Sequence, residues 1–310
     1  MSSASEPVRQ RVLRALALDR TPGYHFAGHF LDLSFDFVSA DAACTSLRVG
    51  PHCAAASGSI DYGALALFTD LAMAANVRAG HDPATRLALV TMTLHFTGAA
   101  LSGRVEASTA LQGYLVGTAT RQGEVSIAIT AERQRACFGI GSFMVLNPPQ
   151  GVTLHARRLR REGDLAVAPL DESDLSDSER AILQRADEAL AAPEGGAFLR
   201  RFWGIDTQRC ADGARGVLRN GAHVANRVGH VQGGVSMGLG MATAESALSE
   251  DWTMSAASAW FIGPCEGQTI EAESTVIHQG KLVSLLRTRV TGKDRRLATE
   301  VVTTHSRKMA

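Results

Sequence analysis

Two long segments of the chain are apolar around most of a helical circumference. They are GALALFTDLAMAANVRAG at 63–80 and GGVSMGLGMATAESAL at 233–248, and small residues dominate both. A helix that carries apolar side chains on nearly every side is buried nearly all round. The pattern therefore predicts two central helices, one in each half of the chain.

Stretches in which apolar and polar residues alternate follow each predicted helix. Residues 90–96 (VTMTLHF) and 125–129 (VSIAI) come after the first, and residues 285–290 (LLRTRV) alternate more loosely after the second. Strand-rich segments are also expected before the helices, at 30–50 and 202–220. Strands with one apolar face form antiparallel sheets that pack this face on a core. We predict an α+β fold, and the pattern leaves the strand order open.

The two halves of the chain repeat one another. Residues 47–63 (LRVGPHCAAASGSIDYG) and 218–234 (LRNGAHVANRVGHVQGG) are identical at seven of seventeen positions when they are aligned at an offset of 171. Residues 96–98 (FTG) and 261–263 (FIG) match later in the same order, with a slightly different offset. Loops of different length produce such changes of offset between duplicated domains. We therefore predict two tandem copies of one domain.

A polar segment lies between the two copies. It contains the acidic stretch DESDLSDSE, in which Ser176 and Glu179 form a capping box for a helix that ends near Ala192. The predicted organisation is an N-terminal helix at 1–22, a first domain at 23–149, a linker with one helix at 150–197, and a second domain at 198–310.

Length and composition agree with two globular domains, since the 310 residues are 45% apolar and 20% charged. The 31 basic and 31 acidic side chains cancel, so no overall field attracts nucleic acid or an anionic membrane. No apolar run reaches the roughly 18–20 residues of a membrane span, and the five scattered cysteines form no C-x-x-C pair. We expect a soluble, cytoplasmic protein without a metal, an organic cofactor, or a nucleic-acid or membrane partner.

A long helix wrapped by an antiparallel sheet, present in two copies, resembles the hot-dog fold. The segment NRVGHVQGG at 226–234 is similar to the signature of the PaaI-like thioesterases of that superfamily. That signature is an Asn, then a Gly, then His-Gly-Gly at the start of the central helix, with an Asp two turns later. The second copy keeps Asn226, Gly233 and Gly234, but it has Gln232 where the family has His and Met241 where the family has Asp.

The first copy shows the reverse pattern. Asp70 fills the position of the family Asp, whereas Ala55 and Asp61 replace the Asn and the His. In the family, each site spans a dimer interface, with the Asn and Gly from one subunit and the Asp from the other. The resemblance therefore implies one composite catalytic site made of Asp70, Asn226, Gln232, Gly233 and Gly234. The opposite site, with Ala55, Asp61 and Met241, would be inactive, and Asp61 would be a helix N-terminal acid favoured by the helix dipole.

These residue types suit attack on a thioester carbonyl. A helix N-terminus offers unpaired N–H groups to the developing negative charge, and Gly233 and Gly234 carry no Cβ that would keep the backbone away. Asp70 would act as the nucleophile or as the base that activates water, because a carboxylate among apolar helix residues is costly without a function. Gln232 and Asn226 would orient the water or the thioester, although Asn226 could instead satisfy its own loop.

Further residues are candidate substrate contacts. Thr91 or Thr93 could supply a hydroxyl beside Asp70, and His230 lies near the predicted site. By contrast, His52 and His223 recur at one spacing in both copies, and we interpret them as structural. Six arginines could meet CoA phosphates, but we interpret them as a solvated face of the linker; they are Arg157, Arg158, Arg160, Arg161, Arg200 and Arg201.

The resemblance implies an acyl-CoA thioesterase, and two alternatives stay open. One is a non-catalytic acyl-binding protein in which both sites have decayed. The other is a hot-dog hydratase or dehydratase, against which the lack of an Asn-Pro and His motif before the central helices counts. Exposed sheet edges favour a homo-oligomer. The acyl group, and the choice between CoA and a carrier protein, are left open.

Overall fold

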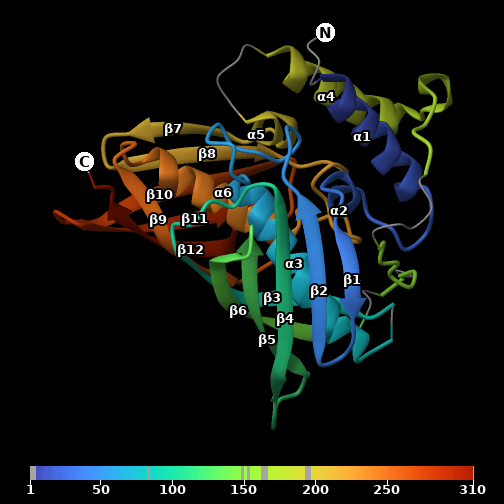
Figure 1. Ribbon diagram of the computed structural model, residues 1–310, viewed down its shortest axis with the longest axis horizontal. Coiled ribbons are helices and arrows are strands. Elements are labelled where there is room, and N and C mark those ends of the chain that lie inside the picture. Colours follow the sequence, from blue (N-terminus) through green and yellow to red (C-terminus); the bar gives the residue numbers. More distant parts are fainter. Residues whose placement is uncertain are drawn as a thin grey trace.

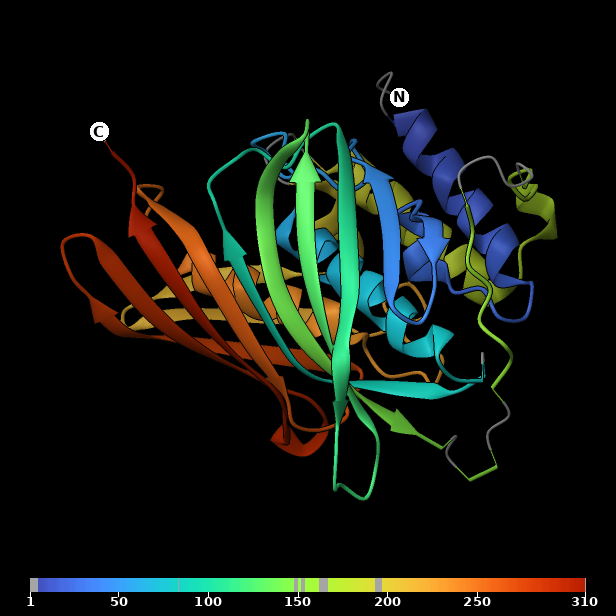
Figure 2. The ribbon, with the colours of Figure 1, turned by 60° about the horizontal axis from the view of Figure 1, so that its bottom comes forward.

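The computed structural model describes residues 5–82, 84–147, 150–151, 154–161, 167–192 and 197–309. Within these ranges, twelve strands form one continuous antiparallel sheet that curves around two central helices (Figures 1 and 2). The α+β class predicted from the sequence is confirmed.

The same succession of elements occurs twice along the chain. The first unit comprises β1 (Ser34–Val38), β2 (Ala42–Arg48), α3 (Tyr62–Ala79), β3 (Arg86–Phe96), β4 (Arg104–Leu115), β5 (Gln122–Ala131) and β6 (Gln134–Leu146). The second comprises β7 (Asp206–Cys210), β8 (Gly213–Arg219), α6 (Gly233–Ser246), β9 (Trp252–Phe261), β10 (Thr269–Gln279), β11 (Val283–Thr291) and β12 (Leu297–Arg307), with a 3-10 turn, η2 (Lys293–Arg295), before β12.

The strand order shows that the two units are copies. Across the sheet the order is β1-β2-β4-β5-β6-β3, followed by β9-β12-β11-β10-β8-β7. When each half is read outward from the middle, equivalent strands appear in the same order. The halves join where β3 pairs with β9, from Thr91 opposite Trp260 to His95 opposite Ala256. Because this pairing continues the ladder, the junction leaves no sheet edge between the units.

The central helices α3 and α6 cross at very close range. A Cβ added to Gly238 would lie 2.5 Å from the Gly63 Cα, and one added to Gly234 would lie 2.5 Å from the Leu67 Cα. The small residues that dominate both sequences are therefore required by the crossing, because a side chain at either position would push the helices apart. This contact brings the start of each helix onto the flank of the other.

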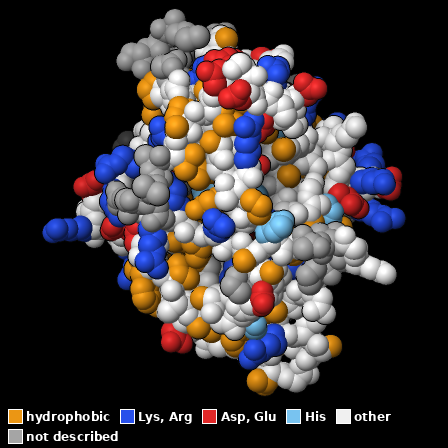
Figure 3. All heavy atoms as spheres, turned by 90° about the vertical axis from the view of Figure 1, so that its right-hand side faces the viewer, with side chains coloured by type: hydrophobic (Ala, Val, Ile, Leu, Met, Phe, Trp, Pro, Cys, Tyr) orange, Lys and Arg blue, Asp and Glu red, His pale blue; other side chains and the backbone are white. Residues whose placement is uncertain are grey.

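The remaining helices cover one end of the sheet. They are α1 (Ser5–Asp19), α2 (Phe26–Phe30), the 3-10 turn η1 (Glu172–Asp174), α4 (Asp177–Ala191) and α5 (Phe198–Trp203). The predicted capping box of α4 is confirmed, with Ser176 and Glu179 bonded reciprocally. Arg9 ties α1 to α4 through Asp187, with Nε to Oδ1 at 2.9 Å. Acidic side chains gather over η1 and the start of α4 (Figure 3).

No helix in the described ranges is long and apolar enough to cross a membrane.

Replacing Gly238 with Ala tests the helix crossing. The added methyl group would collide with the α3 backbone, so we expect a loss of about 1–3 kcal/mol in the free energy of unfolding. Gly80→Ala is the matched control, because Gly80 has φ −86° at the end of α3 and its nearest neighbour is the flexible Tyr114 hydroxyl, 3.2 Å from the added Cβ. Urea unfolding measures both variants, and equal stabilities would contradict the proposed constraint.

Candidate active site

Asp70 of the first unit meets the N-terminus of the central helix of the second unit. The Gly234 N–H donates a hydrogen bond to the Asp70 Oδ2 at 3.0 Å, across 164 residues of sequence. Asp70 is only 7% exposed, and burial raises its pKa to about 6, an effect that the Gly234 N–H and then Arg157 partly offset. The buried carboxylate therefore has a pKa near the range in which it can accept and return protons.

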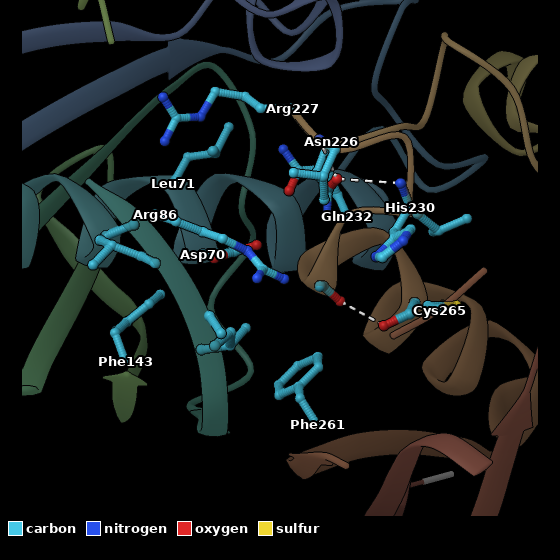
Figure 4. Close-up of a pocket in the computed structure, with 18 of the residues that line it drawn as sticks. Asp70, Leu71, Arg86, Phe143, Asn226, Arg227, His230, Gln232, Phe261 and Cys265 are labelled. Carbon is cyan, nitrogen blue, oxygen red and sulfur yellow. Dashed lines mark hydrogen bonds between the residues drawn. The ribbon is translucent and has the colours of Figure 1, made fainter. Parts of the chain in front are cut away.

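Asp70 lies in the wall of a cavity of about 390 Å³ to which both units contribute. Figure 4 shows Asp70 and Leu71 on α3 facing Asn226, His230 and Gln232 across this space. Its apolar wall comes from α3, β3, β6 and β9; it includes Leu71, Ala74, Ala75, Leu89, Phe143 and Phe261. Polar and charged side chains form the rest of the wall, and a cavity in which an apolar wall faces convergent polar groups is typical of a small-molecule site.

Glycine is required at the first two positions of α6 for two different reasons. Gly234 is required by the helix crossing described above. Gly233 lines the cavity, where an added Cβ would lie 3.4 Å from the Asp70 Oδ2 and 3.2 Å from the Leu89 Cδ2. A side chain at Gly233 would therefore occupy the space in front of the carboxylate. Its N–H belongs to the first turn of the helix, where no intrahelical acceptor exists.

Asn226 precedes this helix and holds its own loop. Its Oδ1 accepts hydrogen bonds from the backbone N–H groups of Val228, at 3.0 Å, and His230, at 3.2 Å. The equivalent loop of the first unit has the same backbone pairing around Ala55, whose N–H donates to the Ser59 carbonyl at 2.8 Å. Because the first-unit loop forms without a side-chain amide, the fold of the second-unit loop does not depend on Asn226. The side-chain NH₂ group of Asn226 is left at the cavity.

Gln232 is buried beside a histidine that the sequence did not indicate. The Gln232 Nε2 lies 3.2 Å from the His25 Nε2, which also lies 2.5 Å from the Ala225 carbonyl oxygen. Burial, followed by the charge of Arg157, lowers the pKa of His25 to about 3, so the ring is neutral. His25 comes from outside the duplicated segments, and no local sequence feature links it to position 232. It holds the start of α6 from the N-terminal side of the chain.

The predicted hydroxyl contacts lie elsewhere. Thr91 and Thr93 do not line the cavity; their hydroxyls pair with those of Ser142, at 2.8 Å, and Ser258, at 3.1 Å. A bulge between Leu89 and Thr91 shifts the alternation of β3, so Leu89 faces the cavity and the threonines face the neighbouring strands.

Two hydroxyls of the second unit reach the cavity instead. The Ser236 Oγ and the Thr299 Oγ1 are 3.0 Å apart, and both residues line the space. His230 lines it as expected, with its Nε2 3.6 Å from the Glu266 Oε2.

Four arginines and one carboxylate, Asp70, are among the described residues that line this cavity. Arg78, Arg86, Arg157 and Arg227 all line it. Burial, and then the neighbouring Arg157, lower the pKa of Arg78 to about 9, whereas burial and then Arg227 lower that of Arg157 to about 10. The cavity is therefore electropositive around Asp70.

The interpretation of these six arginines as a solvated face of the linker was wrong for at least three of them. Arg157 enters the cavity wall, Arg160 pairs with Asp32, and Arg200 pairs with Asp61 through Nε and Oδ2 at 2.7 Å. Arg160 from the linker and Arg200 from α5 thus pair with carboxylates of the first domain, which the local sequence does not indicate.

The opposite end of the helix crossing has the same backbone but different side chains. There the Gly63 N–H donates to the Oδ1 of Asp61 at 2.8 Å, within its own helix, rather than to a carboxylate of the other unit. The equivalent of Asp70 is Met241, which is fully buried. Asp61 is neutralised by Arg200, which also bonds Glu245 at 2.7 Å. The carboxylate at this helix N-terminus is also buried, with Asp61 1% exposed, but it caps its own helix and is paired with Arg200.

His52 and His223 occupy equivalent places away from the cavity. Each is 3% exposed, and burial lowers the pKa values to about 3 and about 4. Each packs edge-on or tilted against a phenylalanine, Phe30 and Phe202. These positions agree with a structural role. Within the described residues, no group of three or more His, Cys, Asp or Glu side chains is placed to hold a metal ion.

Solved structures of similar architecture cover most of this chain. A protein from Alicyclobacillus acidocaldarius, described as having a hot-dog fold, matches with a TM-score of 0.53 and 9% identity over 90% of this chain and 96% of its own. A protein from Lactobacillus plantarum with the provisional name oleoyl thioesterase matches with a TM-score of 0.56 and 9% identity, over 87% of this chain and 97% of its own.

A third structure, from Novosphingobium aromaticivorans and provisionally named a thioesterase, has a TM-score of 0.53 and 13% identity, over 89% of this chain and 99% of its own. No family model matches the sequence, and no curated protein matches it. At these identities the likeness shows the fold: the chain is a double hot-dog, as the sequence predicted.

The raised pKa of Asp70 has a consequence for stability. Because the folded protein favours the protonated acid, ionised Asp70 destabilises it at pH values above about 6, by up to about 3 kcal/mol. Below pH 3.8 both states are protonated and the penalty is absent. We expect Asp70→Asn to raise the melting temperature at pH 8, and the gain to shrink as the pH falls to 4. A loss of stability at pH 8, measured by calorimetry, would contradict this account.

Proposed function

We propose that this chain is an acyl-CoA thioesterase of the PaaI-like kind, with one composite site per chain. One observation carries the proposal: a buried, ionisable carboxylate from one unit lies against the N-terminus of the central helix of the other. Thioester hydrolysis needs a base or nucleophile and a donor for the carbonyl oxygen on opposite sides of one carbon atom. Asp70 and the first turn of α6 supply this pair in a cavity that also has an apolar wall.

The proposed reaction begins with a water molecule beside Asp70. The water oxygen attacks the thioester carbonyl carbon while the Asp70 carboxylate takes a proton from it. The Gly233 N–H, at the positive end of the helix dipole, stabilises the charge that develops on the carbonyl oxygen. The C–S bond then breaks, and the departing thiolate takes the proton from Asp70, which leaves a carboxylic acid and free CoA. Direct attack by Asp70, through an anhydride that water then cleaves, fits the same placement.

Asn226 and Gln232 have supporting places in this scheme. The side-chain NH₂ group of Asn226 is available at the cavity, and Gln232 is held by neutral His25 at the start of α6. Both can donate a hydrogen bond to the water or to the thioester. The opposite end of the helix crossing is proposed to be inactive, because Asp61 caps its own helix and Met241 replaces the carboxylate.

Thiol release from a panel of acyl-CoA esters tests the proposal. We expect wild-type turnover and a loss of about 100-fold in Asp70→Asn, which corresponds to about 2.7 kcal/mol of activation free energy. Asp206→Asn, an exposed carboxylate on the edge strand β7, is the matched control and should retain full activity. Unchanged turnover in Asp70→Asn would reject the site. Ligand binding by the wild type without thiol release would favour the acyl-binding alternative.

The pH dependence of the reaction is a separate test. Attack requires ionised Asp70, so kcat/KM should be half its plateau near pH 6 and should fall about tenfold per pH unit below that value. The Asp70→Asn variant should lose this dependence in its residual activity. A wild-type profile that is flat between pH 5 and pH 8, measured by stopped-flow or continuous thiol detection, would exclude Asp70 as the base.

Self-association is part of the proposal. Phe138 and Ile140 on β6 are 44% and 46% exposed, and Trp260 on β9 is 44% exposed; both strands pair with β3 in the sheet. Exposed aromatic and aliphatic side chains that gather on one sheet face are typical of contact surfaces. We propose that homo-oligomers form through this face.

A further inference from the structure

Two of the four arginines that line the cavity have no hydrogen-bond partner in the described part of the chain. Arg78 and Arg227 both donate to the Thr85 carbonyl oxygen, and Arg227 also donates to the His155 carbonyl at 2.9 Å. These two side chains therefore hold the loop before β3. Arg86 and Arg157 differ, because no group in the described part of the chain accepts a hydrogen bond from either guanidinium. Of these two, Arg157 is the one whose charge acts on the pKa of Asp70.

The backbone on both sides holds Arg157 in place. The Arg158 N–H donates to the Gly23 carbonyl at 2.9 Å, and the Arg160 carbonyl accepts from the Phe35 N–H at 2.7 Å. The segment is thus anchored to the N-terminal region and to the edge strand β1. An arginine that is partly buried, held in position and unpaired keeps five donors for a ligand.

The position of Arg157 relative to Asp70 indicates which part of a substrate it would meet. Both residues line the same cavity, and they lie close enough for each to shift the pKa of the other. In a CoA ester the phosphates are separated from the thioester by the whole pantetheine arm. A group close to the attacked carbonyl therefore belongs to the acyl chain. The neighbouring wall, with Leu71, Ala74 and Ala75, is apolar and suits the methylene groups of a short chain.

We propose that the substrate is a CoA ester of a short dicarboxylic acid, and that Arg157 binds the free carboxylate of its acyl group. This inference rests on the proposed thioesterase function. The guanidinium and a carboxylate can form two parallel charge-assisted hydrogen bonds in a site that excludes most water. The positive charge of Arg157 is thereby neutralised when the substrate binds.

The test compares two esters that differ in this one group, glutaryl-CoA and pentanoyl-CoA. We expect wild-type kcat/KM to favour glutaryl-CoA by about 10- to 100-fold, and Arg157→Gln to abolish this preference by losing activity on glutaryl-CoA alone. Arg158→Gln is the matched control, because this neighbouring side chain is exposed and lies outside the cavity. It should keep the preference.

The same pair of acyl groups on pantetheine, which lacks the nucleotide phosphates, identifies the anion. Persistence of the preference in the pantetheine esters supports the acyl carboxylate. An Arg157→Gln loss that affects both CoA esters equally, and that vanishes with pantetheine esters, would assign Arg157 to the phosphates and overturn the inference. An equal loss with all four esters would assign Arg157 to Asp70 and also overturn it.

Failure of the proposed function is distinguishable from failure of this inference. If the wild type releases no thiol from any ester, the hydrolase proposal fails, and binding of S-carboxyalkyl-CoA and S-alkyl-CoA thioethers of equal length then decides the inference. Calorimetry should show at least tenfold tighter binding of the carboxyalkyl thioether by wild type and not by Arg157→Gln. Equal affinity for the two thioethers would overturn it.

Discussion

The close crossing of α3 and α6 is the contact on which the rest of the structure depends. It requires glycine at 234 and 238, because an added Cβ at either place would lie 2.5 Å from the opposite backbone. The same closeness brings a helix N-terminus of one unit within hydrogen-bonding distance of a side chain two turns into the other. Each end of the crossing can therefore host a site, since the strand order and the sheet junction treat the two units alike.

The two ends differ in how the first N–H groups of the helix are satisfied. At one end the carboxylate comes from the other unit, is buried, and has a raised pKa. At the other end Asp61 caps its own helix and is paired with Arg200, an arrangement that lowers the cost of burial. One buried carboxylate with a raised pKa is enough for one reaction site in a duplicated chain. At the second end, the capped and paired Asp61 maintains the helix crossing without such a carboxylate.

The sequence predicted the features that depend on local pattern and on the duplication. The two buried helices, the capping box at Ser176 and the α+β class follow from periodicity and cap chemistry. The pairing of Asp70 with the α6 N-terminus follows from the resemblance, and the structure brings these groups together.

The strand order could not be predicted, because antiparallel pairing depends on contacts between distant segments. A bulge in β3 placed Thr91 and Thr93 outside the cavity. His25 and Arg157 reach the site from before β1 and from the linker, outside the segments that match between the two copies, so the comparison of these segments did not reveal them.

The arginines around the cavity and the protonation of Asp70 are parts of one electrostatic balance. The Gly234 N–H, then Arg157 and Arg78, oppose the effect of burial and keep the Asp70 pKa from rising further. A carboxylate bound at Arg157 would cancel much of that positive charge and bring a second negative charge into the cavity, and both effects raise the pKa of Asp70. The pKa of Asp70 would therefore move toward neutral pH when the substrate is in place. A group that must take a proton from water and return it to a thiolate works best with a pKa in that range. The ligand that satisfies Arg157 would then also adjust the base that attacks it.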